Sequence, residues 1–258
     1  MRWNAELAYR TRRPSVKAYS PSIDMQEIPE SLSLAVALIT SLNSTMLSIA
    51  GLSLRVSGVA VLTASLLALP FGAWLALARF PGRQAIIAVL NGMMGLPPVV
   101  VGLLVYLLLS RAGPFGALGI LFTPAAMMVA QALLIFPIIA ALARQVIEDA
   151  WSEYREQLVS LNASRMQCMR ALLWDMRFTL TTAVLAGFGR AIAEVGAVMI
   201  VGGNIDGVTR VMTTAISLET SKGDLPLALA LGAVLIAMVV VINLAAQLIK
   251  SMATKRHG

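Results

Sequence analysis

The chain has little of the chemistry that enzymes and metal sites use. It contains one cysteine, Cys168, and one histidine, His257. A single thiol and a single imidazole cannot make a disulfide framework, a zinc site or a Cys/His nucleophile pair. The GxxxxGK[ST] phosphate loop is missing too, so ATP, if it is used, must be bound by another chain. We therefore expect no catalytic residue, no metal site and no cofactor in this chain.

Charge is equally scarce. Only 13% of the 258 residues are charged and 58% are hydrophobic, and no Asp or Glu occurs between Ser31 and Ile147. A soluble domain has about a quarter of its residues charged. The composition therefore predicts an all-α polytopic membrane protein. The net charge of +7 does not indicate nucleic-acid binding, because the basic residues lie at the ends of apolar tracts, where they set the orientation in the bilayer.

Five apolar tracts are long enough to cross the roughly 30 Å hydrocarbon core as helices. The second tract contains Pro97 and Pro98 near its start. Adjacent prolines remove backbone hydrogen bonds, so they predict a break in the helix that must be buried in protein. We expect the five spans at about 56–78, 86–109, 122–143, 178–202 and 225–249, within one transmembrane domain over residues 31–250.

The two ends of the chain are more polar. Residues 1–30 mix both charges and lack the apolar core of a secretory signal, so we expect a flexible tail, with Met25 as an alternative start of translation. Residues 31–54 are long enough to span but rich in hydroxyl and amide groups. We favour a helix at the membrane surface leading into the first span, with a sixth span as the alternative. Residues 251–258 are expected to be a cytoplasmic tail.

Between the third and fourth tracts lies a charged segment, Arg144–Arg177, with five Arg and five acidic residues. Its apolar residues recur in steps of four and three, which predicts one face of an amphipathic helix: Ile147, Trp151, Tyr154, Leu158 and Leu161. Asn162 tolerates left-handed geometry and can end this helix. Ser164 and Gln167 have the spacing of a capping box that starts a second helix.

The distribution of Lys and Arg gives the orientation. The side with Arg79, Arg83, the charged segment and the C-terminal tail has ten Lys and Arg, whereas the loops on the opposite side have four. The positive-inside rule therefore places the charged segment in the cytoplasm.

Parts of the sequence resemble a known family. Residues 156–162 have the spacing of the EAA---G signature of ABC importer permeases, with Asn162 in place of the Gly. Residues 95–116 and 187–232 are similar to tungstate-type oxyanion permeases. Molybdate permeases are less similar and share mainly the elements at Glu194–Ala197 and Gly203–Ile205. The I-x-L-P end of the signature reads Leu-Leu-Trp-Asp at 172–175, which leaves the exit from the second helix undefined.

The resemblance implies the ABC importer permease fold, a multi-pass protein of the prokaryotic cytoplasmic membrane. It implies that the charged segment is a coupling helix seated in a cytoplasmic ABC ATPase, which binds ATP and Mg. It also implies a homodimer and an extracytoplasmic oxyanion-binding protein. The residues expected to couple to the ATPase are Glu156, Ser160, Leu161, Asn162, Ala163 and Ser164.

Two ionisable residues lie inside an apolar tract, Arg190 and Glu194. Their i, i+4 spacing lets them pair, and a charge at mid-membrane costs at least about 2.5–3.5 kcal/mol, so both should face the protein interior or a cavity. A carboxylate would repel an oxyanion, so we interpret Glu194 as a packing partner and Arg190 as the better pathway candidate. Gly203, Asn204 and Thr213 are further pathway candidates, although a turn and a capped helix start would look the same.

Taken together, the residues and the family resemblance imply the membrane subunit of an ATP-driven importer of a tetrahedral oxyanion. Tungstate is the first expectation and molybdate the second. The alternative of another class is a stand-alone secondary transporter driven through Arg190 and Glu194.

Overall fold

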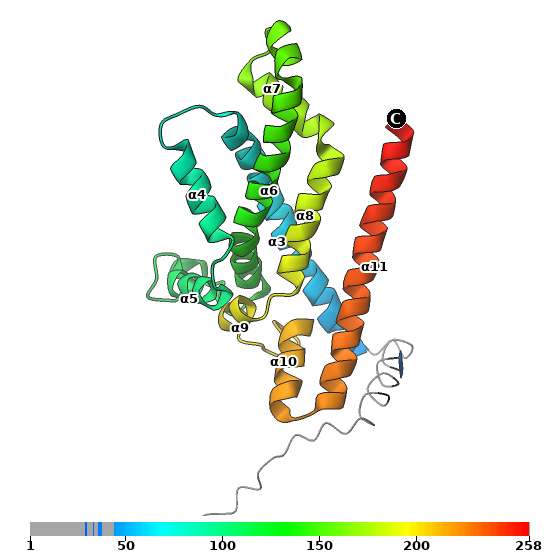
Figure 1. The fold of residues 1–258 in the computed structure, drawn as a ribbon. Helices are drawn as coiled ribbons and strands as arrows, with labels where there is room; N and C mark the ends of the chain where they lie inside the picture. The colour runs from blue at the N-terminus through cyan, green and yellow to red at the C-terminus, as the bar shows by residue number, and fades with distance from the viewer. Residues whose placement is uncertain (1–28, 30–32, 34–35, 38–43, 258) are drawn as a thin grey trace, which may run out of the picture.

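The structure is a computed structural model that describes Pro29, Ser33, Val36, Ala37 and residues 44–257. Most of the predicted tail and of the expected surface helix before residue 44 lies outside the described residues. Figure 1 shows long helices side by side, with α7 at one end and α5, α9 and α10 at the other. The elements are α3 (Ser44–Leu77), α4 (Arg83–Met93), α5 (Pro98–Leu109), η1 (Gly116–Leu118), α6 (Pro124–Ser160), α7 (Arg165–Asp175), α8 (Arg177–Ile192), α9 (Gly196–Gly202), α10 (Met212–Lys222) and α11 (Leu225–His257).

Helix α3 begins earlier than the first expected span. It runs unbroken from Ser44 through Arg55 to Leu77, so the part of the presumed surface helix after residue 43 is continuous with the span. Ser53 does not interrupt it, because its Oγ donates to the Ile49 carbonyl of the same helix at 2.8 Å. At 1.5 Å per residue this helix is about 50 Å long, which is more than the hydrocarbon core requires.

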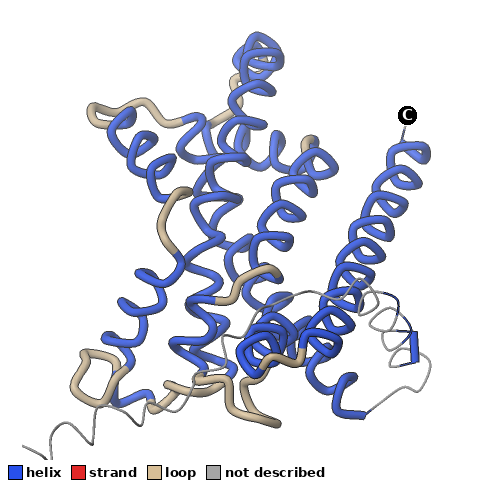
Figure 2. The backbone as a smooth tube through the Cα atoms, turned by 60° about the horizontal axis from the view of Figure 1, so that its bottom comes forward, coloured by secondary structure: helices blue, strands red, loops and turns tan. Residues whose placement is uncertain are grey.

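Three described helices, α3, α6 and α11, are long and apolar enough to cross a membrane by themselves. Two further spans would each consist of a bent pair, α4 with α5 at 102° and α8 with α9 at 60°. Each break is visible in Figure 2 as a short loop between helical segments. The prolines predicted the first break, and Pro98 occupies the start of α5, where its missing N–H costs nothing. The break at residues 193–195 within the fourth expected span was not predicted.

Three other boundaries differ from expectation. Helix α6 continues from the third apolar tract into the charged segment without interruption. Residues 203–224, which separate the fourth and fifth expected spans, contain helix α10. Helix α11 continues to His257 through the expected C-terminal tail, and Asp224 caps its start by accepting the Leu227 N–H at 3.1 Å.

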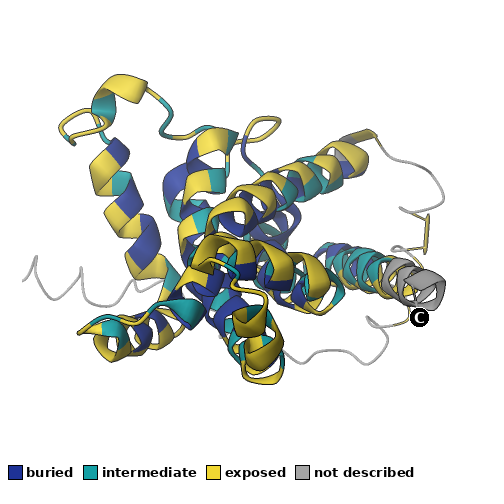
Figure 3. Ribbon diagram, turned by 90° about the horizontal axis from the view of Figure 1, so that it is seen from above, coloured by how far each residue is buried: buried dark blue, intermediate teal, exposed yellow. Residues whose placement is uncertain are grey.

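The core lies between α3, α6 and α8, and small residues dominate it. Ala60, Ala68 and Ala140 are completely buried at these contacts. Many large apolar side chains lie on the outer helix faces instead, where Leu66 is 75% exposed, although Leu75 and Ile139 are fully buried in the core. Figure 3 shows this arrangement end-on, with buried residues toward the centre and exposed residues on the outer helix faces. Small residues inside and large apolar residues outside are typical of helices packed in lipid.

Candidate functional site

The charged segment forms a helical elbow, defined here as residues 156–164 together with the start of α7, at one end of the molecule (Figure 1). Helix α6 ends there in a Schellman motif: the Asn162 N–H donates to the Val159 carbonyl at 2.9 Å and the Ala163 N–H to the Leu158 carbonyl at 3.1 Å. Asn162 has φ +51°, the left-handed conformation that this position requires. Asn in place of the signature Gly therefore preserves the turn.

The second helix starts as the sequence predicts. Ser164 Oγ accepts the Gln167 N–H at 3.4 Å, and Gln167 Oε1 accepts the Ser164 N–H at 2.8 Å. This reciprocal capping box satisfies two backbone donors that would otherwise lack partners. The turn between α6 and α7 is therefore fixed on both sides by its own residues.

The two faces of the charged segment differ in exposure. Ile147 is fully buried, and Trp151, Tyr154 and Leu158 pack against the same apolar cluster, which confirms that part of the predicted face. Leu161 does not belong to it: its side chain is 77% exposed at the tip. The expected coupling residues Glu156, Ser160, Asn162 and Ser164 are also exposed, and Ala163 is half-buried.

The exit from the elbow, which the sequence left undefined, is now visible. Helix α7 ends at Asp175, and only Met176 separates it from α8. The Arg177 guanidinium lies 4.7 Å from the centroid of the Trp174 ring and 4.4 Å from that of Phe178. These cation–π contacts fix the corner at which the chain turns back into the apolar bundle.

The second feature is the break between α8 and α9, where Glu194 accepts three hydrogen bonds. Its carboxylate accepts from the Arg190 guanidinium at 2.5 Å and from the Ala197 N–H at 3.0 Å. Its backbone carbonyl accepts the Thr213 hydroxyl at 2.9 Å. The predicted pair therefore forms, and the side chain of Glu194 is 3% exposed whereas that of Arg190 is 33% exposed.

Gln131 on α6 supports the same break, and our sequence reasoning missed it. Its side-chain amide donates to the Ala191 carbonyl in the last turn of α8 at 2.9 Å, and the same carbonyl also accepts the Glu194 N–H at 3.1 Å. Gln131 is 3% exposed. The sequence did offer a signal, because Gln131 is a polar amide within the apolar tract 122–143. A polar group at membrane depth must find a hydrogen-bond partner in the protein.

The two broken pairs meet face to face. A Cβ on Gly102 of α5 would lie 2.7 Å from the Cα of Ala197 on α9, and one on Gly196 would lie 2.8 Å from the Val99 side chain. Such close approach is possible only without a side chain at these glycines. Helices α5 and α9 are thus locked together beside Arg190 and Glu194.

The remaining pathway candidates serve the local structure. Gly203 and Asn204 have φ of +73° and +51° and form the turn that ends α9. Thr213 donates to the Glu194 carbonyl as described above. The neighbouring Thr209 hydroxyl is fully buried and donates to the Gly202 carbonyl at 2.6 Å. The hydroxyls are therefore engaged with the backbone, and Arg190 is the pathway candidate whose charged group is partly accessible.

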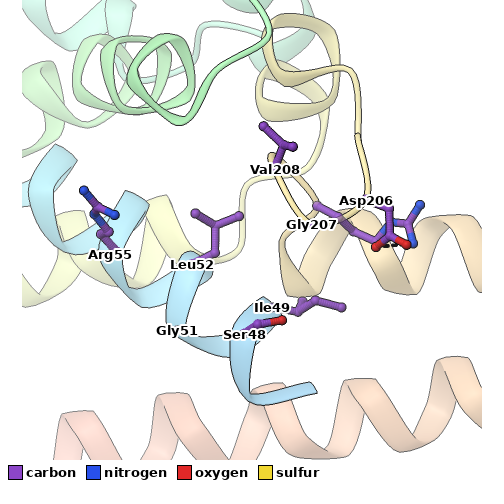
Figure 4. A pocket seen from close by; sticks show the side chains of 9 residues that line it. Ser48, Ile49, Gly51, Leu52, Arg55, Asp206, Gly207 and Val208 are labelled. Atoms are coloured by element: carbon purple, nitrogen blue, oxygen red, sulfur yellow. Dashed lines mark ion pairs between the residues drawn. The ribbon is translucent and has the colours of Figure 1, made fainter. Parts of the chain in front are cut away.

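A hollow of about 600 Å³ opens at the end opposite the elbow, between the start of α3 and the loop before α10. Figure 4 shows Arg55 on one side of it and Asp206 on the other, with Leu52 and Val208 between them. Arg210 also lines the hollow and pairs with Asp206 at 3.0 Å.

The fold and the elbow define a multi-pass helical membrane protein that presents a charged helix–turn–helix at one end. No protein-family model matches the chain. It is 39% identical over 219 residues to the tungstate uptake permease TupB of Peptoclostridium acidaminophilum, covering 85% of this chain and 96% of that protein. It is 38% identical to a probable anion ABC transporter permease of Haloferax volcanii, and the match covers 78% of this chain and 90% of that protein.

The TupB of Campylobacter jejuni is also 38% identical, over 64% of this chain and 69% of that protein. Matches to permeases named for sulfate and molybdenum transport are weaker, at 31% and 28% identity. The chain therefore belongs to the family of tungstate-type oxyanion permeases, the membrane subunits of ABC importers.

Proposed function

We propose that this chain is the membrane-spanning subunit of an ATP-driven importer that takes up tungstate. The observation that carries the proposal is the match over 96% of the length of a tungstate uptake permease. Molybdate is the second candidate substrate, supported by the weaker match to a permease named for molybdenum transport. An extracytoplasmic binding protein would deliver the anion and provide most of the discrimination.

In this account five spans cross the cytoplasmic membrane of a prokaryote. They are α3, the α4–α5 pair, α6, the α8–α9 pair and α11, within a single domain over residues 31–250. The elbow, Arg79, Arg83 and the end of α11 lie on the basic side, which is cytoplasmic by the positive-inside rule.

The elbow is the part that would receive force from a separate ATPase, which binds ATP and Mg. Val159, Leu161 and Met166 are 61%, 77% and 53% exposed on an otherwise polar projection. Apolar side chains gathered on a wet surface mark an interaction site, and a helical projection fits a groove on a partner. Closure of the ATPase dimer would move two such elbows and switch the spans between inward- and outward-facing arrangements.

A second copy of the chain would complete the pathway, because five spans are few to enclose one. The most apolar part of α11 is only 22% buried within the chain, so it has surface left for lipid or for another copy. In this dimer the break at Glu194 is a hinge of the gate, held by Gln131 and Thr213. Arg190 would meet the anion along the pathway.

Reconstitution with a competing anion tests the function. Proteoliposomes with the permease, its ATPase and its binding protein should take up tungstate when ATP is supplied on the elbow side, and excess molybdate should compete weakly. Stronger competition by molybdate than by tungstate would assign the system to molybdate. Ion-driven uptake without the ATPase would instead favour the stand-alone secondary transporter.

Substitution of Arg190 tests the pathway assignment. Arg190→Ala should lower uptake about tenfold or more, because a hydrogen bond to a charged group is worth about 1.5–3 kcal/mol. Assembly with the ATPase should be unchanged. Arg190→Lys retains the charge beside Glu194 and should keep part of the uptake. Normal uptake by the Ala variant would remove Arg190 from the mechanism.

A further inference from the structure

Glu148 lies at the base of the elbow, where α6 leaves the apolar bundle. It is the first acidic residue after the acid-free stretch that starts at Ser31. One carboxylate oxygen accepts from Arg83 at 2.6 Å, and the other accepts from Arg144, one helical turn earlier on α6. One anion thus pairs with two guanidinium groups, and such charge-assisted bonds are the stronger kind.

Both arginines are largely removed from water. Their side chains are 18% exposed at Arg83 and 11% exposed at Arg144. The Nε of Arg144 is buried and has no hydrogen-bond partner within the described part of the chain. Without Glu148, two poorly solvated cations would lie side by side with no ion-pair partner among the described residues, which is costly. The cluster is therefore held together by this one carboxylate.

Arg83 also joins the cluster to another helix. As the first residue of α4, it donates from Nε to the Leu75 carbonyl at 2.9 Å and from a terminal nitrogen to the Ala76 carbonyl at 3.3 Å. These carbonyls belong to the last turn of α3, whose acceptors have no partner within the helix, and a cation is favourable there. Through Arg83, the end of α3, the start of α4 and the base of the elbow meet at one point.

The packing below this point leaves little room for sliding. A Cβ on Gly72 of α3 would lie 2.5 Å from the Ala140 carbonyl oxygen and 3.0 Å from the backbone nitrogen of Arg144. Arg165, at the start of α7, also reaches the Leu77 carbonyl at 3.4 Å. The end of α3 thus contacts both helices that the elbow joins. Helix α6 is connected to it through Glu148 and Arg83, and α7 through Arg165.

We propose that Glu148 is a positioning residue for energy coupling, which locks the elbow to α3 and α4 so that movement of the elbow reaches the broken spans. The inference rests on the proposed function, because it requires an ATPase that moves the elbow. Helix α4 leads directly into α5, and α5 is locked to α9 beside Arg190 through Gly102. The chain of contacts from elbow to pathway candidate is thus continuous.

The test compares transport with ATP hydrolysis in the reconstituted complex of permease, ATPase and binding protein. Glu148→Gln should lower the amount of tungstate transported per ATP hydrolysed about fivefold or more, the lower end of typical coupling between sites. Co-purification with the ATPase should be unchanged, because the elbow tip is intact. Asp149→Asn is the matched control: it removes the same charge at the next, exposed position and should leave the ratio unchanged.

Arg83→Gln provides a second, milder variant, since it leaves the Arg144–Glu148 pair in place. It should also lower the amount of tungstate transported per ATP hydrolysed. If Glu148→Gln does not assemble with the ATPase, the result for Arg83→Gln decides whether the proposal stands. A wild-type ratio in both assembled variants, or an equal loss in Asp149→Asn, would overturn the proposal. A wild-type complex that transports no oxyanion with ATP would instead refute the proposed function.

Discussion

The substitution Glu194→Gln tests whether this carboxylate holds the break between α8 and α9 in place. Gln keeps the size of the side chain, and its oxygen can still accept from the Ala197 N–H. Its NH₂ group, however, would face the Arg190 guanidinium, so two donors would meet where an ion pair of 2.5 Å now lies. The variant therefore removes one charge-assisted bond and leaves the shape nearly unchanged.

The expected cost follows from the burial of the two partners. A hydrogen bond to a charged group contributes about 1.5–3 kcal/mol. Glu194 is 3% exposed but Arg190 is 33% exposed, so water can partly compensate the freed guanidinium, and we expect about 1–2 kcal/mol. For a chain of this size, that loss lowers the midpoint of thermal unfolding by about 2–8 °C.

Tryptophan fluorescence during heating of the purified permease in detergent measures this midpoint. The matched control is Glu219→Gln, because Glu219 also pairs with a cation on its own helix, Lys222, at 2.8 Å. Lys222 is 55% exposed, so the control should lower the midpoint by less than about 2 °C. A Glu194→Gln variant no less stable than this control would refute the idea that Glu194 secures the break.

Two further substitutions test the geometry of the elbow and of the helix contact. Asn162→Gly should keep wild-type co-purification with the ATPase, whereas Asn162→Val should reduce it. A β-branched residue at φ +51° costs at least about 1–2 kcal/mol. Equal recovery of the ATPase with both variants would contradict a role for this turn. Gly102→Leu should abolish uptake and destabilise the permease by about 1–3 kcal/mol, since even a Cβ would lie 2.7 Å from Ala197. Gly58→Leu, with nothing within 4 Å of its added Cβ, should do neither, and identical uptake by the two leucine variants would refute the contact.

Local signals in the sequence predicted much of this architecture. The apolar tracts located the long apolar helices and the bent helix pairs, the paired prolines located the break before α5, and Asn162 with Ser164 and Gln167 located the turn of the elbow. These predictions succeeded because each depends on residues close together in the chain. The Arg190–Glu194 pair is predictable for the same reason, since i, i+4 neighbours share a helix face.

The features that were missed depend on contacts between distant segments. The break at 193–195 contains no proline; it is supported by Gln131 from α6 and Thr213 from α10, whose contacts cannot be read from local sequence. Arg55 suggested the start of a span, but its charge is accommodated on an exposed face of α3. Likewise, no local pattern shows that Glu148 joins Arg83, 65 residues away in the sequence.

Oxyanion accumulation by sealed vesicles tests the central claim most directly. Vesicles that contain this permease with its binding protein should accumulate no tungstate, whether or not ATP is present on the elbow side. Addition of the ATPase to the same side should start ATP-dependent accumulation. Accumulation by vesicles that lack any nucleotide-hydrolysing subunit would contradict the account.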